Sequence, residues 1–296
     1  YREDEFDTLL NYADHIVFNS VSQLRKFGQK TKEQGKSIGL RVNPECSTQV
    51  GHEIYDPCAP GSRLGVTRAV FDREMTENTL ELLDGLHFHT LCEQNSDALS
   101  ITLTALESKF GDILPKMKWL NMGGGHHITK DGYDIPLLEK CILSAKEKWG
   151  VEVYLEPGEA VALNAGYLAS RVLDVVENGE TRIAILDVSA ACHMPDVIEM
   201  PYTPPLYQET ECEDGADCRL AGPTCLSGDI IGDYKMAEPI KEGDLLLFGD
   251  MAIYTTCKNN TFNGMPLPYI YRLDEHGKIS LISDFGYTDF KYRLGH

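Results

Sequence analysis

Three consecutive glycines end an apolar stretch, in the segment Asn121-Met-Gly-Gly-Gly-His-His127. Because glycine lacks a Cβ, such a run at a strand end lets backbone N–H groups approach an anion closely, which suits a phosphate. The spacing matches neither a Rossmann nor a Walker loop, and a plain turn is the alternative. His126 and His127 either contact the same anion or simply begin the loop. Together with His193 they could suggest a metal, but the glycine context favours phosphate.

Glu156 ends another apolar stretch, in Tyr154-Leu-Glu-Pro-Gly-Glu159. Pro157 and Gly158 would close a strand sharply, so the Glu156 carboxylate would point into the mouth of a barrel. A carboxylate there can keep a ring nitrogen protonated, which turns a pyridinium cofactor into an electron sink. A simple capping acid is the alternative interpretation.

Other polar residues occupy comparable positions. His89 ends Leu86-His-Phe-His89, where it would either stack on an aromatic cofactor or be a core histidine with satisfied hydrogen bonds. The segment Gly222-Pro-Thr-Cys-Leu-Ser-Gly-Asp229 has the composition of a loop, which suits a site better than a core position. Tyr254, at the end of Asp250-Met-Ala-Ile-Tyr254, could donate to a phosphate or pack as a half-buried ring.

Strands and helices alternate in the first half of the chain and would position these groups. Apolar runs at residues 15–18, 38–42, 86–90, 119–122 and 151–155 predict strands, and helical periodicity occurs over 21–34, 71–83, 96–110 and 136–149. Such alternation predicts a parallel sheet. Repeated units whose strands end in polar or glycine residues favour an α/β barrel with its site at the carboxyl ends of the strands.

The second half of the chain is rich in β-type runs, at residues 167–176, 181–188, 245–248, 269–272 and 278–282. Asp274-Glu-His-Gly277 between the last two is a hairpin signal. We therefore predict an α/β barrel over residues 1–163 and a mainly β domain over residues 164–296. Whether residues 181–196 return to the barrel is left open.

Composition and charge exclude several classes of protein. Of the 296 residues, 42% are hydrophobic and 25% charged, which is ordinary for a globular protein. The net charge of −19 disfavours a nucleic-acid partner and is compatible with a cationic substrate, or with solubility alone. No stretch is apolar enough to predict a membrane span. The nine scattered cysteines predict thiols in a reducing cytoplasm, and we expect the acidic segment from Cys212 to Cys218 to be a flexible loop rather than a metal site.

The order of the motifs is more informative than any one of them. A strand with His89, a strand with the glycine run and a strand with Glu156 are followed by Gly-Pro-Thr-Cys225 and Tyr254. In this order the chain resembles the fold-type III (alanine-racemase-like) decarboxylases that use pyridoxal 5'-phosphate (PLP). That group includes ornithine, arginine, diaminopimelate and carboxynorspermidine decarboxylases. The resemblance covers essentially the whole chain and implies PLP as cofactor and a homodimer with shared active sites.

The resemblance also implies roles for individual residues. The residues that would bind PLP are His89, Gly123, Gly124, Gly125, Glu156, Tyr254 and Arg41. Among them, His89 would stack on the ring, Glu156 would pair with its nitrogen, and the glycines and Tyr254 would hold the phosphate. Arg41 would lie beneath the cofactor, with a salt bridge at the strand end as the alternative. Cys225 and Asp229 would reach the active site of a second subunit, where the thiol would protonate the carbanion left by CO2.

The lysine that binds PLP as a Schiff base has no counterpart in this sequence. The family carries it on the first barrel strand, whereas Lys118 already belongs to the glycine-rich unit. The chain begins at Tyr1 without an initiator Met, a signal region or a basic leader. We therefore expect this start to be a truncation, with roughly the first quarter of the full protein and the lysine preceding it.

The residue after Glu156-Pro-Gly narrows the substrate. Ornithine-type enzymes usually show arginine there, whereas this chain has Glu159, which should face a cation. Five segments resemble carboxynorspermidine and carboxyspermidine decarboxylases: His15-Ile-Val-Phe-Asn-Ser20 with Gln23-Leu24, Gly39-Leu-Arg-Val-Asn-Pro44, Ser62-Arg-Leu-Gly65, Cys92-Glu-Gln94 and Ala191-Cys-His-Met-Pro-Asp196. The resemblance implies that Glu159 and Asp196 bind the amines of a long polyamine through charge-assisted hydrogen bonds. For Asp196, an ordinary loop residue is the alternative.

Other functions remain open at this point. Diaminopimelate decarboxylases have a similar loop with Cys225, Ser227 and Asp229, but their second substrate carboxylate needs a cation where this chain has Glu159. A non-catalytic, polyamine-binding homologue would lack the lysine even in the full protein. A metal-dependent barrel hydrolase would use His126, His127 and Glu156. The sequence does not distinguish carboxynorspermidine from carboxyspermidine.

Overall fold

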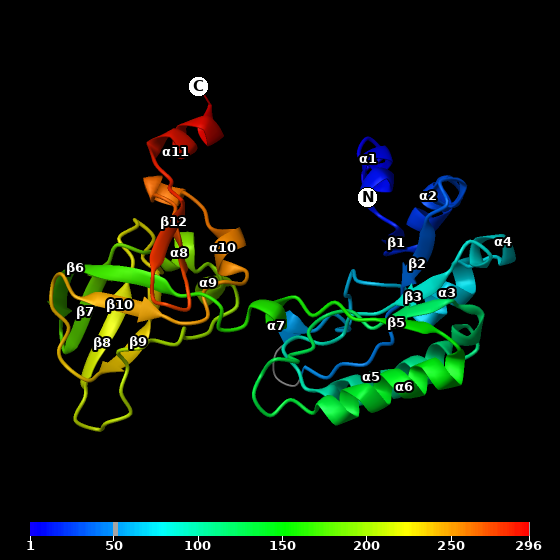
Figure 1. Cartoon of the computed structure of the whole chain (residues 1–296), viewed down its shortest axis with the longest axis horizontal. Helices are drawn as coiled ribbons and strands as arrows, with labels where there is room; N and C mark the ends of the chain where they lie inside the picture. The colour runs from blue at the N-terminus through cyan, green and yellow to red at the C-terminus, as the bar shows by residue number, and fades with distance from the viewer. Residues whose placement is uncertain (50–52, 296) are drawn as a thin grey trace. The chain divides into compact units, whose positions relative to one another are not determined.

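The computed structural model describes residues 1–49 and 53–295. The chain divides into two compact units, Tyr1–Val161 and Ala162–His296 (Figure 1). Each unit has its own hydrophobic core. Within the described residues, no helix combines the length and apolar character needed to cross a membrane.

The first unit is built on a sheet of five parallel strands. They are β1 (His15–Phe18), β2 (Ser37–Arg41), β3 (Gly85–His87), β4 (Trp119–Asn121) and β5 (Glu152–Tyr154), and their order in the sheet follows the chain. Every neighbouring pair is parallel. Sequential parallel strands joined by helices are the arrangement of a barrel wall. The fully buried Phe18, Leu40, Leu86 and Leu120 place the core along successive strands.

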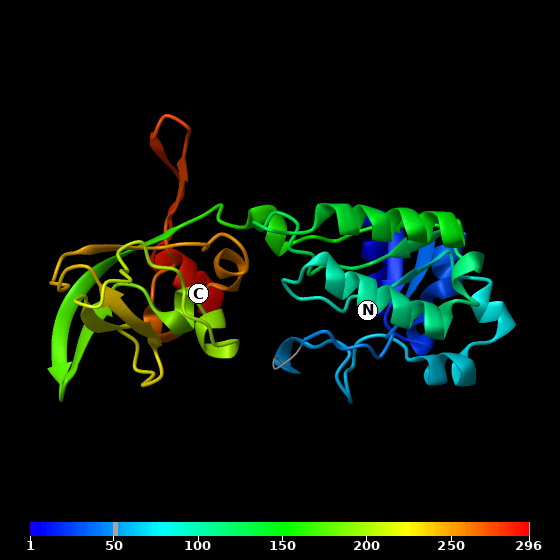
Figure 2. The ribbon, with the colours of Figure 1, turned by 90° about the horizontal axis from the view of Figure 1, so that it is seen from below.

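Helices join these strands. The longest are α2 (Val21–Glu33), α5 (Ser96–Phe110) and α6 (Ile135–Trp149). In α6, the Asp134 side chain accepts from the backbone N of Leu137 and Pro136 occupies the first turn, while Gly150 ends the helix in the left-handed conformation. Helices α5 and α6 lie side by side (Figures 1 and 2). The shorter elements are α1 (Phe6–Tyr12), η1 (Glu53–Tyr55), α3 (Arg68–Glu74), α4 (Glu77–Leu80), η2 (Leu114–Lys116) and α7 (Glu159–Ala162).

The single helix expected over residues 71–83 is wrong. Two short helices, α3 and α4, occupy this region, and the chain between them is extended at Met75. Thr76 starts the second helix because its hydroxyl accepts from the backbone N of Thr79 at 3.3 Å. Threonine is a preferred residue at a helix start, so this local cap overrides the continuous apolar periodicity.

The second unit contains a five-stranded sheet in the order β10-β6-β7-β8-β9. Its strands are β6 (Leu168–Asn178), β7 (Thr181–Leu186), β8 (Ala216–Ala221), β9 (Ile230–Met236) and β10 (Leu245–Phe248). All pairs are antiparallel except β7 with β8. Strand β7 lies between β6 and β8, so it pairs within this unit and not with a strand of the first sheet. Strands β8 and β9 were not among the predicted strands.

A separate hairpin and several short helices complete the second unit. The hairpin pairs β11 (Ile270–Leu273) with β12 (Ile279–Ser283), as the turn signal predicted. Asp274 stabilises the turn, because its carboxylate accepts from the backbone N of His276 and of Lys278. The helices are α8 (Ala190–His193), α9 (Asp196–Glu199), α10 (Thr255–Lys258), η3 (Phe262–Gly264) and α11 (Tyr287–Leu294).

Candidate active site

The carboxyl ends of four neighbouring strands bring together most of the predicted site residues of the first unit. Arg41 is the last residue of β2, His89 follows β3, the glycine run follows β4 and Glu156 follows β5. Because all four strands are parallel and adjacent, these ends lie on one edge of the sheet. This is the edge at which barrels of this kind carry their sites.

The glycine run packs tightly between the two neighbouring strand ends. A Cβ on Gly123 would lie 2.4 Å from the carbonyl oxygen of Phe88, and one on Gly125 would lie 2.1 Å from that of Leu91. Both glycines also have a positive φ, of 70° and 78°. Side chains are therefore excluded here, and the backbone forms the surface of the loop. The amide of Glu156 donates to the carbonyl of Gly123 at 2.8 Å, which ties the loop to the next motif.

Glu156 is held in its ionised form. Its Oε1 accepts from the Asn121 side-chain amide at 2.8 Å, and its Oε2 lies 3.5 Å from Nε2 of His87. The hydrogen bond with His87 is the main cause that lowers the pKa of Glu156 to about 2. Partial burial opposes the shift, and the hydrogen bond with Asn121 adds to it. The side chain is still 49% exposed. It is therefore an accessible anion that can pair with a protonated ring nitrogen.

His89 and Arg41 are linked through the backbone. Burial, and then the nearby Arg41 charge, lower the pKa of His89 to about 4, so its ring is neutral near pH 7. Its Nδ1 accepts from the backbone N of Gly124 at 3.1 Å. Arg41 donates to the carbonyl of His89 at 3.3 Å. A flat neutral ring beside the glycine run is suited to stacking on an aromatic cofactor.

The two histidines after the glycines have different environments. His126 is buried and its Nε2 lies 3.3 Å from the carbonyl of Met122, and burial lowers its pKa. His127 instead faces Glu159, with Nε2 2.9 Å from Oε2. Throughout residues 1–49 and 53–295 no group of three or more His, Cys, Asp or Glu side chains could hold a metal ion. Of the Cys212 to Cys218 segment, Cys212 is exposed and Cys218 is buried on β8.

In the second unit, Asp229 is buried and engaged in several hydrogen bonds. One carboxylate oxygen accepts from the Ser189 hydroxyl at 3.0 Å and from the Ala191 amide at 3.3 Å. The other accepts from the Thr224 hydroxyl at 2.7 Å. These bonds fix the loop that carries the exposed thiol of Cys225. A contact between Asp229 and substrate stays a prediction, and the observed geometry gives this residue a loop-positioning role.

Asp196 and Tyr254 lie near a lysine that the sequence analysis did not identify. Lys258 contacts the Asp196 carboxylate and lies 3.2 Å from that of Glu199, and the bond with Asp196 is the main cause of its raised pKa. The Lys258 ammonium lies 5.8 Å from the centre of the Tyr254 ring. Lys258 follows Tyr254 by four residues, the spacing at which side chains meet on a helix, and this spacing was the available signal.

Residues 12–252 match the family model described as "Pyridoxal-dependent decarboxylase, C-terminal sheet domain". The chain belongs to the pyridoxal-dependent decarboxylases. It is 43% identical to a carboxynorspermidine/carboxyspermidine decarboxylase of Campylobacter jejuni, over 99% of this chain and 78% of the relative. It is 40% identical to a carboxyaminopropylagmatine decarboxylase of Synechocystis, over 100% of this chain and 76% of the relative.

Solved structures agree with this assignment. A crystal structure of Campylobacter jejuni carboxynorspermidine decarboxylase complexed with norspermidine superposes with a TM-score of 0.86 at 42% identity, covering 99% of this chain and 78% of that one. A diaminopimelate decarboxylase structure, with a TM-score of 0.80 at 19% identity, covers 99% of this chain and 75% of that chain and shows the fold alone. The predicted barrel plus β-domain and the PLP-dependent decarboxylase activity are confirmed. Membership in this family also excludes the metal-dependent hydrolase.

The residues of this decarboxylase at the strand ends fit PLP. The glycine run presents backbone without side chains to a phosphate, His89 offers a neutral ring, and Glu156 offers an ionised carboxylate. Two supporting residues, His87 and Asn121, were missed in the sequence analysis. They pair in register on β3 and β4, and each lies two residues before a predicted site residue, so strand alternation was the signal that could have found them.

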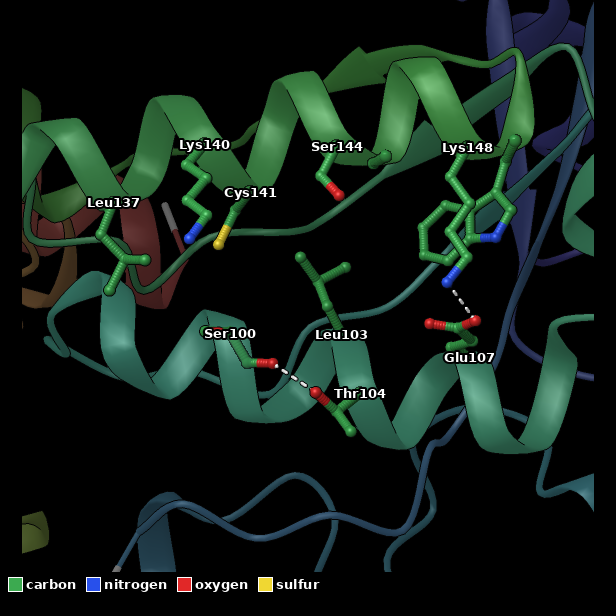
Figure 3. Close-up of a pocket in the computed structure, with 11 residues that line it drawn as sticks. Ser100, Leu103, Thr104, Glu107, Leu137, Lys140, Cys141, Ser144 and Lys148 are labelled. Atoms are coloured by element: carbon green, nitrogen blue, oxygen red, sulfur yellow. Dashed lines mark hydrogen bonds and ion pairs between the residues drawn. The ribbon is translucent and has the colours of Figure 1, made fainter.

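A groove on the helix layer is separate from this site. It has a volume of about 200 Å3 and lies between α5 and α6, with Leu103, Cys141 and Ser144 among its lining residues (Figure 3). Lys148 and Glu107 form an ion pair across it. None of the predicted site residues lines it, so we assign it no role in the decarboxylase reaction.

Proposed function

We propose that this decarboxylase acts on carboxynorspermidine and carboxyspermidine, releasing CO2 to give norspermidine and spermidine. The observation that carries the proposal is Glu159, an anion that His127 holds next to the glycine loop. At this position a cationic group of the substrate would be attracted and a second carboxylate would be repelled. The proposal agrees with the names of two relatives, at 43% and 32% identity.

Carboxyaminopropylagmatine is a second candidate substrate. The Synechocystis relative that acts on this compound is 40% identical over the whole length of the present chain. The compound also combines an α-carboxylate with distant cationic groups, so Glu159 suits it equally. Diaminopimelate is less compatible, because its second carboxylate would face Glu159. Four diaminopimelate decarboxylases that match this chain are 23–28% identical to it.

The site residues of the first unit would prepare the cofactor for decarboxylation. PLP, when bound, accepts the electron pair that the departing carboxylate leaves behind. Glu156 would hold a proton on the pyridine nitrogen, because its low pKa keeps it ionised near pH 7. His89 would stack on the ring, and Gly123, Gly124 and Gly125 would donate backbone hydrogen bonds to the phosphate. Arg41 would add positive charge beneath the ring.

Residues of the second unit would complete a site shared between two subunits. We propose that the Cys225 thiol returns a proton to the carbon that has lost CO2, and that Asp229 orients the loop that carries Cys225. The exposure of Cys225 and the buried hydrogen bonds of Asp229 support this division of roles. Tyr254 would donate to the phosphate. Asp196 would bind a substrate amine, which must then compete with Lys258 for its carboxylate.

A homodimer in the cytoplasm is part of the same proposal. Shared sites require a second subunit, because the loop that carries Cys225 would act in the partner's barrel. All nine cysteines are unpaired thiols in the structure, which suits a reducing compartment.

The experiment that tests the proposal is CO2 release by the full-length, PLP-loaded protein. The substrates are carboxynorspermidine, carboxyspermidine, carboxyaminopropylagmatine and diaminopimelate. We expect the highest kcat/KM on one of the first two compounds. Preferred turnover of carboxyaminopropylagmatine would favour the second candidate, and activity on diaminopimelate alone would contradict both.

A further inference from the structure

We infer that His127 is a positioning residue that fixes the Glu159 carboxylate and so makes the enzyme selective for cationic substrates. This inference rests on the proposed function, in which Glu159 contacts a substrate amine. In that proposal His127 binds neither the substrate nor the cofactor. It acts through Glu159 and not on the reacting atoms.

The contact between the two side chains is close and shielded from water. Nε2 of His127 lies 2.9 Å from Oε2 and 3.2 Å from Oε1 of Glu159. The side chains are only 5% and 15% exposed, respectively. Because a carboxylate can only accept, the imidazole donates from Nε2 and both oxygens lie within its reach. In such a shielded environment a hydrogen bond determines orientation more strongly than it would at the surface.

The contact with His127 supports Glu159, whose own element is short. It is the first residue of α7, a helix of four residues. A single helical turn has little stability of its own, since helix formation requires a costly nucleus. Two residues that follow the glycine run contact α7. His127 binds Glu159, and the Thr129 hydroxyl donates to the carbonyl of Ala160.

His127 is in turn anchored to the loop that would hold the phosphate. Its backbone N donates to the carbonyl of Gln94 at 3.2 Å, and the backbone N of Gln94 donates to that of Gly125 at 3.0 Å. The Gln94 side chain accepts from Thr48 and Gln49, both at 2.8 Å. The orientation of Glu159 is thus set relative to the phosphate end of the site. An enzyme that selects substrates by their charge and chain length requires a fixed distance between the phosphate site and the Glu159 carboxylate.

The hydrogen bonds of the His127 ring indicate that its main partner is Glu159. Nδ1 of His127 is buried and has no hydrogen-bond partner among the described residues. His126 differs, because its ring nitrogen lies against the Met122 carbonyl and so supports the backbone. Replacing the His127 ring should therefore disturb Glu159 before it disturbs the loop.

Three variants of the full-length, PLP-loaded protein test this inference. His127→Leu removes the donor, His127→Gln keeps an N–H group near the position of Nε2, and Glu159→Gln removes the anion. We expect His127→Leu and Glu159→Gln each to raise KM for carboxynorspermidine by about tenfold or more, as loss of a charge-assisted contact does. We expect kcat and the visible absorbance of bound PLP to change little, and His127→Gln to recover most of the affinity. In the double variant His127→Leu/Glu159→Gln the two effects should not add.

Two results would overturn the inference. One is an unchanged KM in His127→Leu; the other is a parallel loss of kcat and PLP absorbance, which would make His127 part of the cofactor site. A wild-type enzyme that does not turn over carboxynorspermidine contradicts the proposed substrate instead. The same variants measured with carboxyaminopropylagmatine, which is also cationic, would then still decide the role of His127.

Discussion

Nε2 of His87 lies 3.5 Å from Oε2 of Glu156, and the two residues lie at the carboxyl ends of different strands, on the same edge of the sheet. His87 is the last residue of β3, whereas Glu156 lies two residues beyond β5. Asn121 at the end of β4 contacts the same carboxylate from the intervening strand. Three adjacent strands therefore cooperate to keep one carboxylate ionised where the cofactor nitrogen is expected.

Glu156→Gln should lower kcat by about 100-fold, because a neutral amide cannot hold the ring nitrogen protonated. Steady-state CO2 release measures kcat, and the visible absorbance of bound PLP reports the cofactor content. Glu152→Gln is a suitable control, since Glu152 lies at the other end of β5 and is exposed. A kcat near the wild-type value in Glu156→Gln would contradict the assigned role.

The low pKa of Glu156 predicts a specific dependence of stability on pH. Its value of about 2 in the folded protein lies below the ordinary 4.5, so the folded state favours the ionised form. This contribution is fully present above pH 4.5 and disappears as the pH falls toward 2. The difference in unfolding free energy between the wild type and Glu156→Gln should therefore be constant from neutral pH down to pH 4.5. Below pH 4.5 the contribution of Glu156 to this difference should decrease steadily. Urea unfolding at several pH values measures it, and a difference that changes mainly above pH 5 would contradict the shift.

Gly125→Ala should destabilise the protein and weaken PLP binding. The left-handed backbone would cost about 1–2 kcal/mol, and the overlap with the Leu91 carbonyl would add about 1–3 kcal/mol. Gly132→Ala is the matched control, because Gly132 has a similar φ of 80° but no atom within 4 Å of an added Cβ. Thermal unfolding and PLP titration are measured for both variants. Gly132→Ala reports the cost of backbone strain alone, whereas Gly125→Ala adds the steric overlap. Equal effects in the two variants would contradict close packing of the glycine run.

Cys225→Ala should lower activity alone, whereas Asp229→Ala should lower both activity and stability. Cys225 is exposed, so its loss should lower kcat by about 100-fold and leave the unfolding free energy nearly unchanged. Asp229 is buried, and its removal leaves donors on Ser189 and Thr224 unpaired, which should cost about 3 kcal/mol as well as activity. Cys212→Ala, at another exposed thiol, is the control. A stable and fully active Asp229→Ala variant would show that the loop does not depend on this carboxylate.

The sequence predicts the strand-end residues well because each follows a strongly apolar run. His89, the glycines and Glu156 could be assigned to one sheet edge before any coordinates, since parallel neighbours end on the same side. Partnerships between distant residues could not be predicted in this way. The pairs His127–Glu159 and Asp196–Lys258 join segments 32 and 62 residues apart, and no local pattern records such separations.

Local rules also failed where short polar segments form regular structure. Strands β8 and β9 carry charged residues such as Arg219 and Asp233, which pair with each other across the strands at 2.7 Å. This cross-strand ion pair compensates for the weak apolar alternation of each strand. The hydrogen bond between Asp229 and Ser189 joins residues 40 positions apart, so no local pattern predicts the burial of Asp229.

We propose that Glu159 makes this decarboxylase selective for cationic, carboxylated polyamines. The most direct test is the ratio of kcat/KM for carboxynorspermidine to that for diaminopimelate, measured in the wild type and in Glu159→Gln. We expect a ratio well above one in the wild type and a fall of about tenfold or more in the variant, caused mainly by a higher KM for carboxynorspermidine. A wild-type ratio below one, or a ratio that the substitution leaves unchanged, would contradict it.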